Sequence, residues 1–295
     1  MSERNDGNPN GDRRLTREEG RVGRDRTPTE IPKQKNQPIS SLTASYKLGN
    51  PQHPLIQHDN GFLDKFSPRA PSLEDYAKLA KWKAMLEGGE AFRPDLTDAL
   101  GAYRHFLEGK GKPRQFSYER YVMGDISGKT TLRNAILDIQ QGAMDLWENR
   151  LKGQSLSSFQ LTGSAISCGG SNPLFPYPVT ENWQKAIGGH VIWLSGIVTI
   201  TKNRNDLPQF DMTMTLHAED RYNFNPGATD IATGIPDADN GIFEITGLAH
   251  QYDHFSELTR KVQWVGVKTV TNFSTSSTNQ RQRQPQDNRR IRNRI

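Results

Sequence analysis

The sequence predicts an α+β fold, in which a helical region precedes a C-terminal antiparallel, half-barrel-like β-sheet and disordered polar tails flank both. Three observations support this prediction. Apolar residues recur at helical spacing over residues 70–152, strand-like alternation occupies residues 155–270, and the two patterns do not interleave as in a βαβ protein. We therefore expect one folded domain over residues 46–272, between tails at 1–45 and 273–295.

The tails are predicted from composition. Hydrophobic residues make up only 33% of the 295 residues, which is low for a globular chain. Residues 1–45 contain almost no large apolar side chains, and the chain from Phe273 onward is rich in Ser, Thr, Asn and Gln and then in Arg. Such segments cannot bury enough apolar surface to offset their chain entropy.

The net charge of +5 comes from the predicted tails and not from the folded part. Residues 281–295 alone carry +5 and residues 1–45 carry +2, which leaves −2 for residues 46–280. A domain that binds nucleic acid through a basic face is therefore not expected. The Arg-rich tail leaves a nucleic-acid-associated role open as an alternative, beside that of a non-specific solvated tail.

Three helices are predicted in the first half of the domain. Ser72 can cap the first helix, with Asp75 three residues on, and Gly88-Gly89 should end it. A second helix should follow Pro94 and stop at Gly109, and a third should run over about 130–151.

The second half of the domain is predicted to form strands, because β-branched and aromatic residues alternate with polar ones and Gly, Pro and Asn interrupt these runs. We expect these strands near residues 158–167, 190–201, 209–222, 241–247 and 257–268.

The strand at 209–222 carries the main candidate site. Its apolar face consists of Phe210, Met212, Met214, Leu216 and Ala218. Continued with a period of two, this face receives Asp220 and then Tyr222, so a carboxylate and a phenol arrive where the core has been. A buried carboxylate needs hydrogen bonds or a cavity, and an acid paired with a phenol at a strand end suits acid/base chemistry. The alternative is that Asp220 caps the following turn and Tyr222 is ordinary core.

No segment of the sequence resembles a secretory signal, and no run of about 18 apolar residues occurs. We expect a protein made in the cytoplasm and, if it acts outside the cell, exported by a separate apparatus. The sequence also lacks a Gly-x-Ser-x-Gly elbow, a His-Glu-x-x-His zinc helix and a P-loop.

Two segments resemble the catalytic domain of the colicin M-like toxins. The first is residues 99–111, which end in His105-Phe106-Leu107-Glu108-Gly109-Lys110-Gly111; the second is Asp220-Arg221-Tyr222-Asn223-Phe224-Asn225. They are similar to that family's His-aromatic-Leu-x-Gly-x-Gly stretch and to its Asp-x-Tyr-Asp signature. The resemblance covers roughly residues 95–268.

The resemblance implies an antibacterial toxin that hydrolyses lipid II, or a related polyprenyl-pyrophosphate precursor of peptidoglycan, with Mg²⁺ in the periplasm of the target cell. It further implies a cognate immunity protein and a secretion apparatus. The short N-terminal part ahead of the match favours contact-dependent delivery, such as type VI.

This sequence departs from the family pattern at two points. Asn223 stands at the position of the second Asp, and Thr229-Asp230 or its neighbours stand at the position of a His-Arg pair. Asn cannot act as a general base, and the missing Arg removes a partner for pyrophosphate. Either the chemistry is rebuilt from other residues, or the substrate has changed, or catalysis is lost and the chain is a binding or structural protein.

The predicted catalytic set is therefore Asp220, Tyr222, Asn223, Asp230 and His250, with Asp220 and Asp230 as metal ligands. His250 and His254 are the histidines that could replace the missing imidazole. The run 237–241, Asp-Ala-Asp-Asn-Gly, has the composition of a metal-binding loop but is too short, and a hairpin turn is the alternative.

Overall fold

The structure is a computed structural model that describes residues 43–154, 157–170, 172–231, 233–266 and 274–277. The chain divides into two units, Met1–Pro38 and Ile39–Ile295. The first unit lies wholly outside the described residues, and so does most of both predicted tails. The described residues all belong to the second unit.

The sheet is open and almost entirely antiparallel. Its strands are β1 (Tyr46–Leu48), β2 (Arg114–Gln115), β3 (Ser158–Gly163), β4 (Ile166–Cys168), β5 (His190–Lys202), β6 (Pro208–Tyr222), β7 (Tyr252–Val265) and β8 (Ser274–Ser277). The order is β1-β3-β5-β6-β7-β2, with β4 beside β5 and β8 beside β7. Only β2 runs parallel to its neighbour. The four residues of β8 belong to the segment predicted as a C-terminal tail, and they pair with β7 instead.

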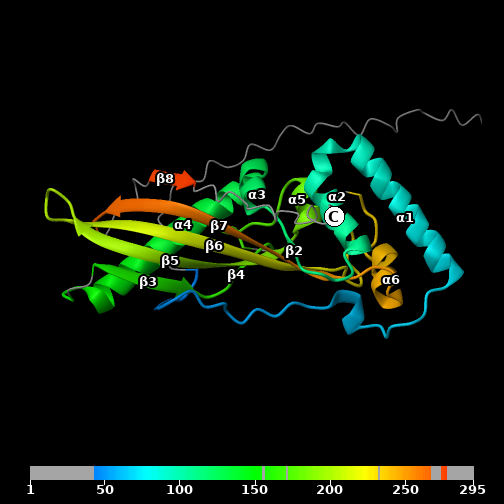
Figure 1. Cartoon of the computed structure of the whole chain (residues 1–295), viewed down its shortest axis with the longest axis horizontal. Coiled ribbons are helices and arrows are strands. Elements are labelled where there is room, and N and C mark those ends of the chain that lie inside the picture. Colours follow the sequence, from blue (N-terminus) through cyan, green and yellow to red (C-terminus); the bar gives the residue numbers. More distant parts are fainter. Residues whose placement is uncertain (1–42, 155–156, 171, 232, 267–273, 278–295) are drawn as a thin grey trace, which may run out of the picture. The chain divides into compact units, whose positions relative to one another are not determined.

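Three helices precede the long strands and a fourth covers one face of the sheet (Figure 1). The helices are α1 (Leu73–Phe92), α2 (Thr97–Glu108), α3 (Tyr118–Gly124), α4 (Ile126–Leu146), α5 (Glu181–Ala186) and α6 (Ala238–Thr246). A 3-10 turn precedes α1 at Gly61–Asp64, another precedes α2 at Pro94–Leu96, and a π-helical turn at Trp147–Leu151 extends α4.

The main core lies between α4 and the inner face of the long strands. Ile139 and Ala143 of α4 pack in one buried cluster with the inward side chains of β5 and β6. The inward residues of β6 are Phe210, Met212, Met214, Leu216 and Ala218, all of which are buried as their alternation predicts.

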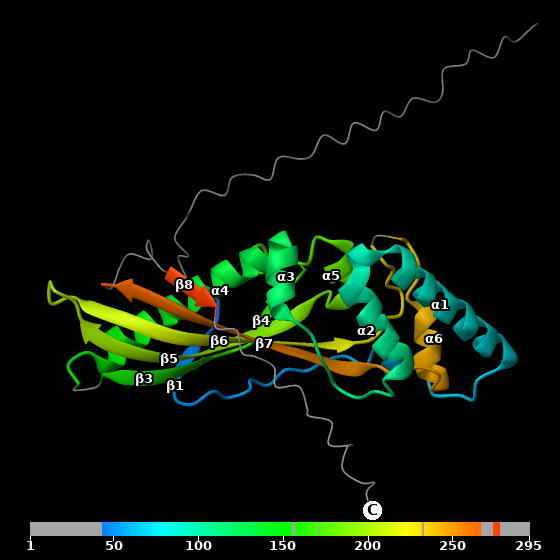
Figure 2. The same cartoon turned by 45° about the horizontal axis from the view of Figure 1, so that its top comes forward.

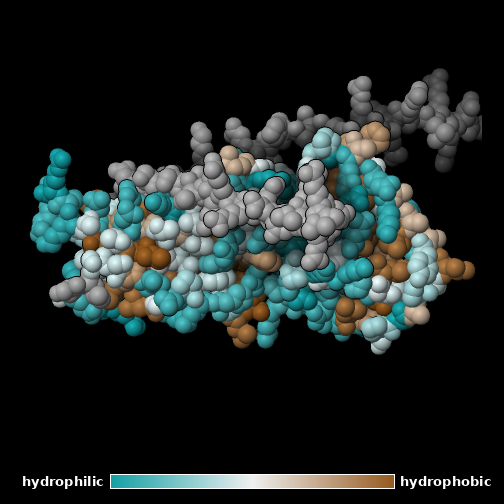
Figure 3. Space-filling view, viewed as in Figure 1, coloured by the Kyte–Doolittle hydropathy of each residue, from teal (hydrophilic) through white to brown (hydrophobic). Residues whose placement is uncertain are grey.

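A second, smaller core lies where β6 and the start of β7 meet α1, α2 and α6. Figure 2 shows these three helices gathered at one end of the sheet. The buried residues of this core include Leu86, Phe106, Phe243 and Tyr252. The second core is less completely covered than the first, because α1 exposes several large apolar side chains, and Figure 3 shows hydrophobic residues at the surface of this end.

The α+β class is confirmed, and the three predicted helices are present with shifted ends. Ser72 and Asp75 form the predicted capping box of α1. Gly88-Gly89 does not end α1, which continues to Phe92. The helix ends instead at Arg93, because the residue before a proline disfavours the helical conformation and Arg93 adopts φ −125° and ψ 66°.

The strand predicted at 241–247 is wrong, because this segment is helix α6. Short apolar runs do not distinguish a strand from a buried helix by periodicity. Almost every side chain of this helix from Asn240 to Thr246 is buried, so it shows no polar face. Its C-terminal signal is Gly247, which takes the left-handed conformation with φ 67°. The run 237–241 is the first turn of this helix and not a hairpin turn.

Strand β7 begins five residues before its predicted start at residue 257. Its inward face contains His254, Ser256 and Arg260, all buried, and these polar residues hide the alternation. Arg260 reaches Glu119 at 2.7 Å, which satisfies a guanidinium that would otherwise be costly to bury.

Among the described residues, no helix combines the length and apolar character that crossing a bilayer requires.

Candidate active site

The inward face of β6 changes character at its last two positions. Asp220 lies opposite His254 of β7 in the antiparallel ladder, and Tyr222 lies opposite Tyr252. The rings of Tyr222 and Tyr252 stack with centroids 5.1 Å apart and planes 14° apart. The strand therefore delivers a carboxyl and a phenol beyond the main core, as strand parity predicts.

Both side chains line a pocket of about 580 Å³. One wall is formed by Trp82 of α1 and by Ala99, Leu100 and Tyr103 of α2. The other walls come from the loop that contains Tyr177, from α5, and from residues 223–237. The volume lies within the range of small-molecule sites, and the pocket combines apolar walls with a few polar groups.

Asp220 is the most perturbed acid of the pocket. Burial raises the pKa of its carboxyl to about 8, and Asp59 adds to the shift, while the backbone N–H and the positive charge of Arg221 oppose it. No ion pair to this carboxyl occurs within the described part of the chain. The carboxyl of Asp220 is thus protonated at neutral pH and can serve as a proton donor.

Tyr222 keeps its proton as well. Burial raises the pKa of the Tyr222 phenol well above its usual range, Arg114 lowers it in part, and Asp220, Asp237 and Asp230 add to the rise. Its hydroxyl group forms no hydrogen bond with the described residues. Asp220 does not cap the following turn. The Tyr222 ring packs against the second core, as the alternative expects, but its hydroxyl group remains available to a ligand.

Asn223 and Asp230 also line the pocket, but their polar atoms are engaged. The Asn223 amide donates to the backbone carbonyl of Asp59 at 3.0 Å and to its carboxylate at 2.9 Å. One oxygen of Asp230 accepts from the backbone N–H and the hydroxyl of Thr233, both at 2.6 Å. The other oxygen lies 3.2 Å from Lys185 Nζ.

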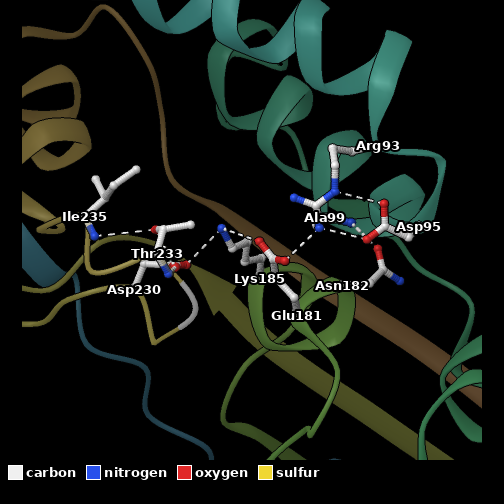
Figure 4. Close-up of polar contacts among 9 residues, drawn as sticks. All are labelled: Arg93, Asp95, Ala99, Glu181, Asn182, Lys185, Asp230, Thr233 and Ile235. Carbon is white, nitrogen blue, oxygen red and sulfur yellow. Dashed lines mark hydrogen bonds and ion pairs between the residues drawn. The ribbon is translucent and has the colours of Figure 1, made fainter. Parts of the chain in front are cut away.

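These contacts lower the pKa of Asp230. Burial alone would raise it, but the hydrogen bonds from Thr233 and the charge of Lys185 outweigh that effect. Figure 4 shows how Lys185 also meets Glu181, which in turn meets Arg93 after the end of α1. Asp230 thus belongs to a chain of ion pairs that joins the pocket loop to α5 and to the end of α1.

The structure does not bring His250 to the pocket. This residue is exposed between α6 and β7, and its backbone N–H donates to the carbonyl of Phe106 at 3.1 Å. His254 is fully buried behind Asp220, where Arg114 approaches its Nε2 at 2.9 Å. Burial and the charge of Arg114 lower the pKa of His254 to about 3, so its imidazole is neutral.

His217 lies on the opposite face of the sheet from Asp220, as strand parity predicts. Its Nε2 is 3.0 Å from Ser195 Oγ and its Nδ1 is 2.9 Å from Glu257. The order of these contacts is that of a Ser-His-Glu triad. However, only 3% of the surface of Ser195 is exposed, so a substrate cannot reach it. Its backbone groups also lie inside the ladder between β3 and β6, which leaves no oxyanion site.

The donor set does not form a metal centre. Within the described ranges, no three His, Cys, Asp or Glu side chains converge as metal ligands would. Asp220 is protonated at neutral pH, and Asp230 is committed to Lys185 and Thr233. The predicted Mg²⁺ site therefore stays a prediction.

Sequence reasoning missed Tyr177 and Lys185, which also line the pocket. Tyr177 lies in an irregular loop, where no periodicity identifies an inward side chain. The available signal was the presence of glycine pairs on both sides, Gly169-Gly170 and Gly188-Gly189, since paired glycines often mark a close approach of backbone to another group.

Comparisons with known proteins give little further information. No family model matches the chain, and no curated protein matches it significantly. Among solved structures, the chain is similar to PaeM, a colicin M-like bacteriocin produced by Pseudomonas aeruginosa, with a TM-score of 0.35 and 18% identity. The match covers 58% of this chain and 51% of that chain, so this chain spans about half the length of PaeM. A likeness at this level does not assign the chain to a family.

Proposed function

We propose that the chain is an antibacterial toxin whose pocket hydrolyses lipid II or a related polyprenyl-pyrophosphate precursor of peptidoglycan. One observation carries this proposal. The two segments that resemble colicin M-like toxins are more than a hundred residues apart, yet Ala99, Leu100 and Tyr103 of the first line the same pocket as Asp220 to Asn225 of the second.

The chemistry of Asp220 fits this reaction. Hydrolysis between the polyprenyl chain and the pyrophosphate transfers a water oxygen to phosphorus and releases the polyprenyl oxygen as an alcohol. The leaving oxygen must gain a proton, which the protonated carboxyl of Asp220 can donate. The proton lost by the attacking water then returns the Asp220 carboxyl to its starting form, so the cycle is balanced.

The engaged state of Asn223 and Asp230 supports a different role for each. Asn223 fixes the segment at Asp59 that forms a wall of the pocket, and Asp230 fixes Lys185. We assign both to shaping the pocket, so that of the predicted catalytic set Asp220 and Tyr222 are the residues that contact substrate. The same engagement would also suit a chain that binds the precursor without cleaving it, which is the second candidate function.

The toxin would act at the periplasmic membrane surface of the target cell, after export by a secretion apparatus, and its producer would need an immunity protein. The C-terminal Arg-rich tail lies outside the described residues, and none of the residues that line the pocket belongs to it. Deleting residues 278–295 should therefore leave precursor cleavage intact in vitro.

The experiment that tests the proposal is incubation of the full-length protein with lipid II, in Mg²⁺ and in EDTA, followed by separation of the products. We expect release of the pyrophosphate-linked disaccharide-peptide by the wild type and loss of at least about 100-fold in Asp220→Asn, since a general acid typically contributes 10²–10⁴-fold. Asp211→Asn, on the outer face of the same strand, is the matched control and should remain active. Tight binding of lipid II without product would establish the second candidate.

A further inference from the structure

Each basic side chain that lines the pocket contacts a carboxylate. Lys185 Nζ lies 3.0 Å from Glu181 and 3.2 Å from Asp230. Arg221 Nε lies 2.8 Å from Asp253. His58, the lining histidine among the described residues, lies 3.2 Å from Glu219. A phosphate that entered the pocket would have to compete with a carboxylate for Lys185 and for Nε of Arg221.

Two lining phenols have no such competitor. The hydroxyl groups of Tyr177 and Tyr222 form no hydrogen bond with the part of the chain that the structure describes, whereas Tyr103 donates to Asn240 at 2.6 Å. Tyr177 and Tyr222 come from different walls, one from the loop before α5 and one from the end of β6. These two phenols therefore offer neutral hydroxyl donors to a ligand without first losing a contact with the described residues.

The Tyr177 ring lies close to the backbone of two glycines. A Cβ atom on Gly188 would lie 3.3 Å from the Tyr177 hydroxyl oxygen, and one on Gly169 would lie 3.4 Å from the ring. Both glycines have positive φ, +51° and +126°, which other residues rarely adopt. The loop is closed by the Gly169 N–H, which donates to the Phe175 carbonyl at 2.8 Å. The close backbone thus restricts the phenol ring before any ligand arrives.

The surrounding charge keeps this phenol a donor. Burial raises the pKa of Tyr177, and the carboxyl groups of Asp220, Asp230 and Asp237 each add to the rise. Burial raises the pKa of Asp220 to about 8, which reduces the negative charge that an entering anion meets at neutral pH. A neutral O–H group can donate to a phosphate oxygen without the help of a cation.

We propose that Tyr177, together with Tyr222, binds the phosphate oxygens of the substrate through its hydroxyl group, so that the pocket holds pyrophosphate by phenol donors and not by lysine or arginine. This inference rests on the proposed function for the identity of the substrate. It makes Tyr177 a substrate-binding residue on the wall that faces the proton donor Asp220.

Calorimetric titration of the full-length protein with inorganic pyrophosphate in EDTA tests the inference separately from catalysis. We expect saturable binding by the wild type and binding at least about 10-fold weaker in Tyr177→Phe, because a hydrogen bond to a charged group contributes about 1.5–3 kcal/mol. Tyr222→Phe should weaken binding similarly. Tyr76→Phe, which removes a hydroxyl from the exposed face of α1, is the control and should bind as the wild type does.

Every result of this titration either supports or overturns the inference. Since the Tyr177 hydroxyl has no protein partner to lose, Tyr177→Phe should unfold at the wild-type temperature. Equal pyrophosphate affinity in Tyr177→Phe and wild type, or no binding by the wild type, would overturn the inference. Binding that depends on Tyr177 without any cleavage of lipid II would uphold it and reject the proposed hydrolysis.

Discussion

Asp220 and His254 are cross-strand neighbours on the inner face of the sheet, and at neutral pH neither carries a charge. An acid and an imidazole in this position could have formed an ion pair. Burial instead raises the pKa of Asp220 to about 8 and lowers the pKa of His254 to about 3, the second with help from the charge of Arg114. The proton stays on the acid, which is the condition for a proton donor next to the pocket.

The pH dependence of cleavage should follow the proton on Asp220. The protonated carboxyl is the active form, so kcat/KM should be level below about pH 8 and should fall as pH rises through about 8. The measurement is the rate of lipid II cleavage between pH 5 and pH 10. A rate that increases through pH 8 would show that Asp220 acts as a base, contrary to its assigned role.

Glu244 should make the fold less stable as pH rises. This carboxyl is 6% exposed, one of its oxygens accepts from the Phe224 N–H at 3.0 Å, and the other has no partner in the described structure. Burial raises its pKa to about 8, while the Phe224 N–H opposes the shift. The folded state therefore holds a proton that the unfolded state releases near pH 4.5, so stability is full below that pH and declines toward pH 8.

Glu244→Gln removes this titration while keeping the shape of the side chain. We expect the unfolding temperature of the variant to depend less on pH between 5 and 8 than that of the wild type, and to be higher at pH 8 by several degrees, since about 1 kcal/mol corresponds to roughly 2–4 °C at this size. Glu87→Gln, exposed on α1, is the control. Parallel curves for wild type and Glu244→Gln would contradict the prediction.

How far the sequence predicts this site depends on which element carries each residue. Strand β6 places Asp220 and Tyr222 correctly, because a two-residue period over fifteen residues leaves no doubt about which side chains face inward. The meeting of α2 with the end of β6 is not encoded in any local pattern, and the sequence does not predict it.

The errors have local physical causes. Helix α6 is buried on most sides, so its sequence shows neither the polar face of a surface helix nor an unambiguous strand. His254 and Arg260 place polar groups on the inward face of β7 and are compensated by residues far away in the chain, Arg114 and Glu119. Tyr177 is positioned by the backbone of glycines in a loop, for which the sequence offers no periodic signal.

The ion pair between Lys185 and Asp230 should hold the pocket loop in place. Lys185→Met removes the positive charge and frees the loop at residues 228–236 from α5. We expect faster amide hydrogen exchange in that loop, with little change in the sheet, because the effect is a local opening. Lys202→Met breaks the exposed pair with Asp206 and should leave the loop unchanged. Unaltered exchange at 228–236 in Lys185→Met would show that the loop is held by other contacts.

The packing of Gly241 against Phe62 offers a test of the wall that positions Asp59. Alanine is favoured over glycine inside a helix by about 1 kcal/mol, so Gly241→Ala would be stabilising if only propensity counted. A Cβ atom at this position would, however, clash with the Phe62 ring. We expect net destabilisation of about 1–3 kcal/mol, as for other overpacked sites.

Gly88→Ala in α1 is the matched control for this substitution. A Cβ atom there would meet nothing within 4 Å, so this variant should be stabilised by up to about 1 kcal/mol. Denaturant unfolding of both variants measures the difference. Phe62→Ala should remove most of the penalty of Gly241→Ala in the double variant, since the clash then has no partner. If Gly241→Ala were as stable as Gly88→Ala, the turn at Gly61–Asp64 would not pack on α6, and the wall of the pocket that includes Asp59 would lose its support.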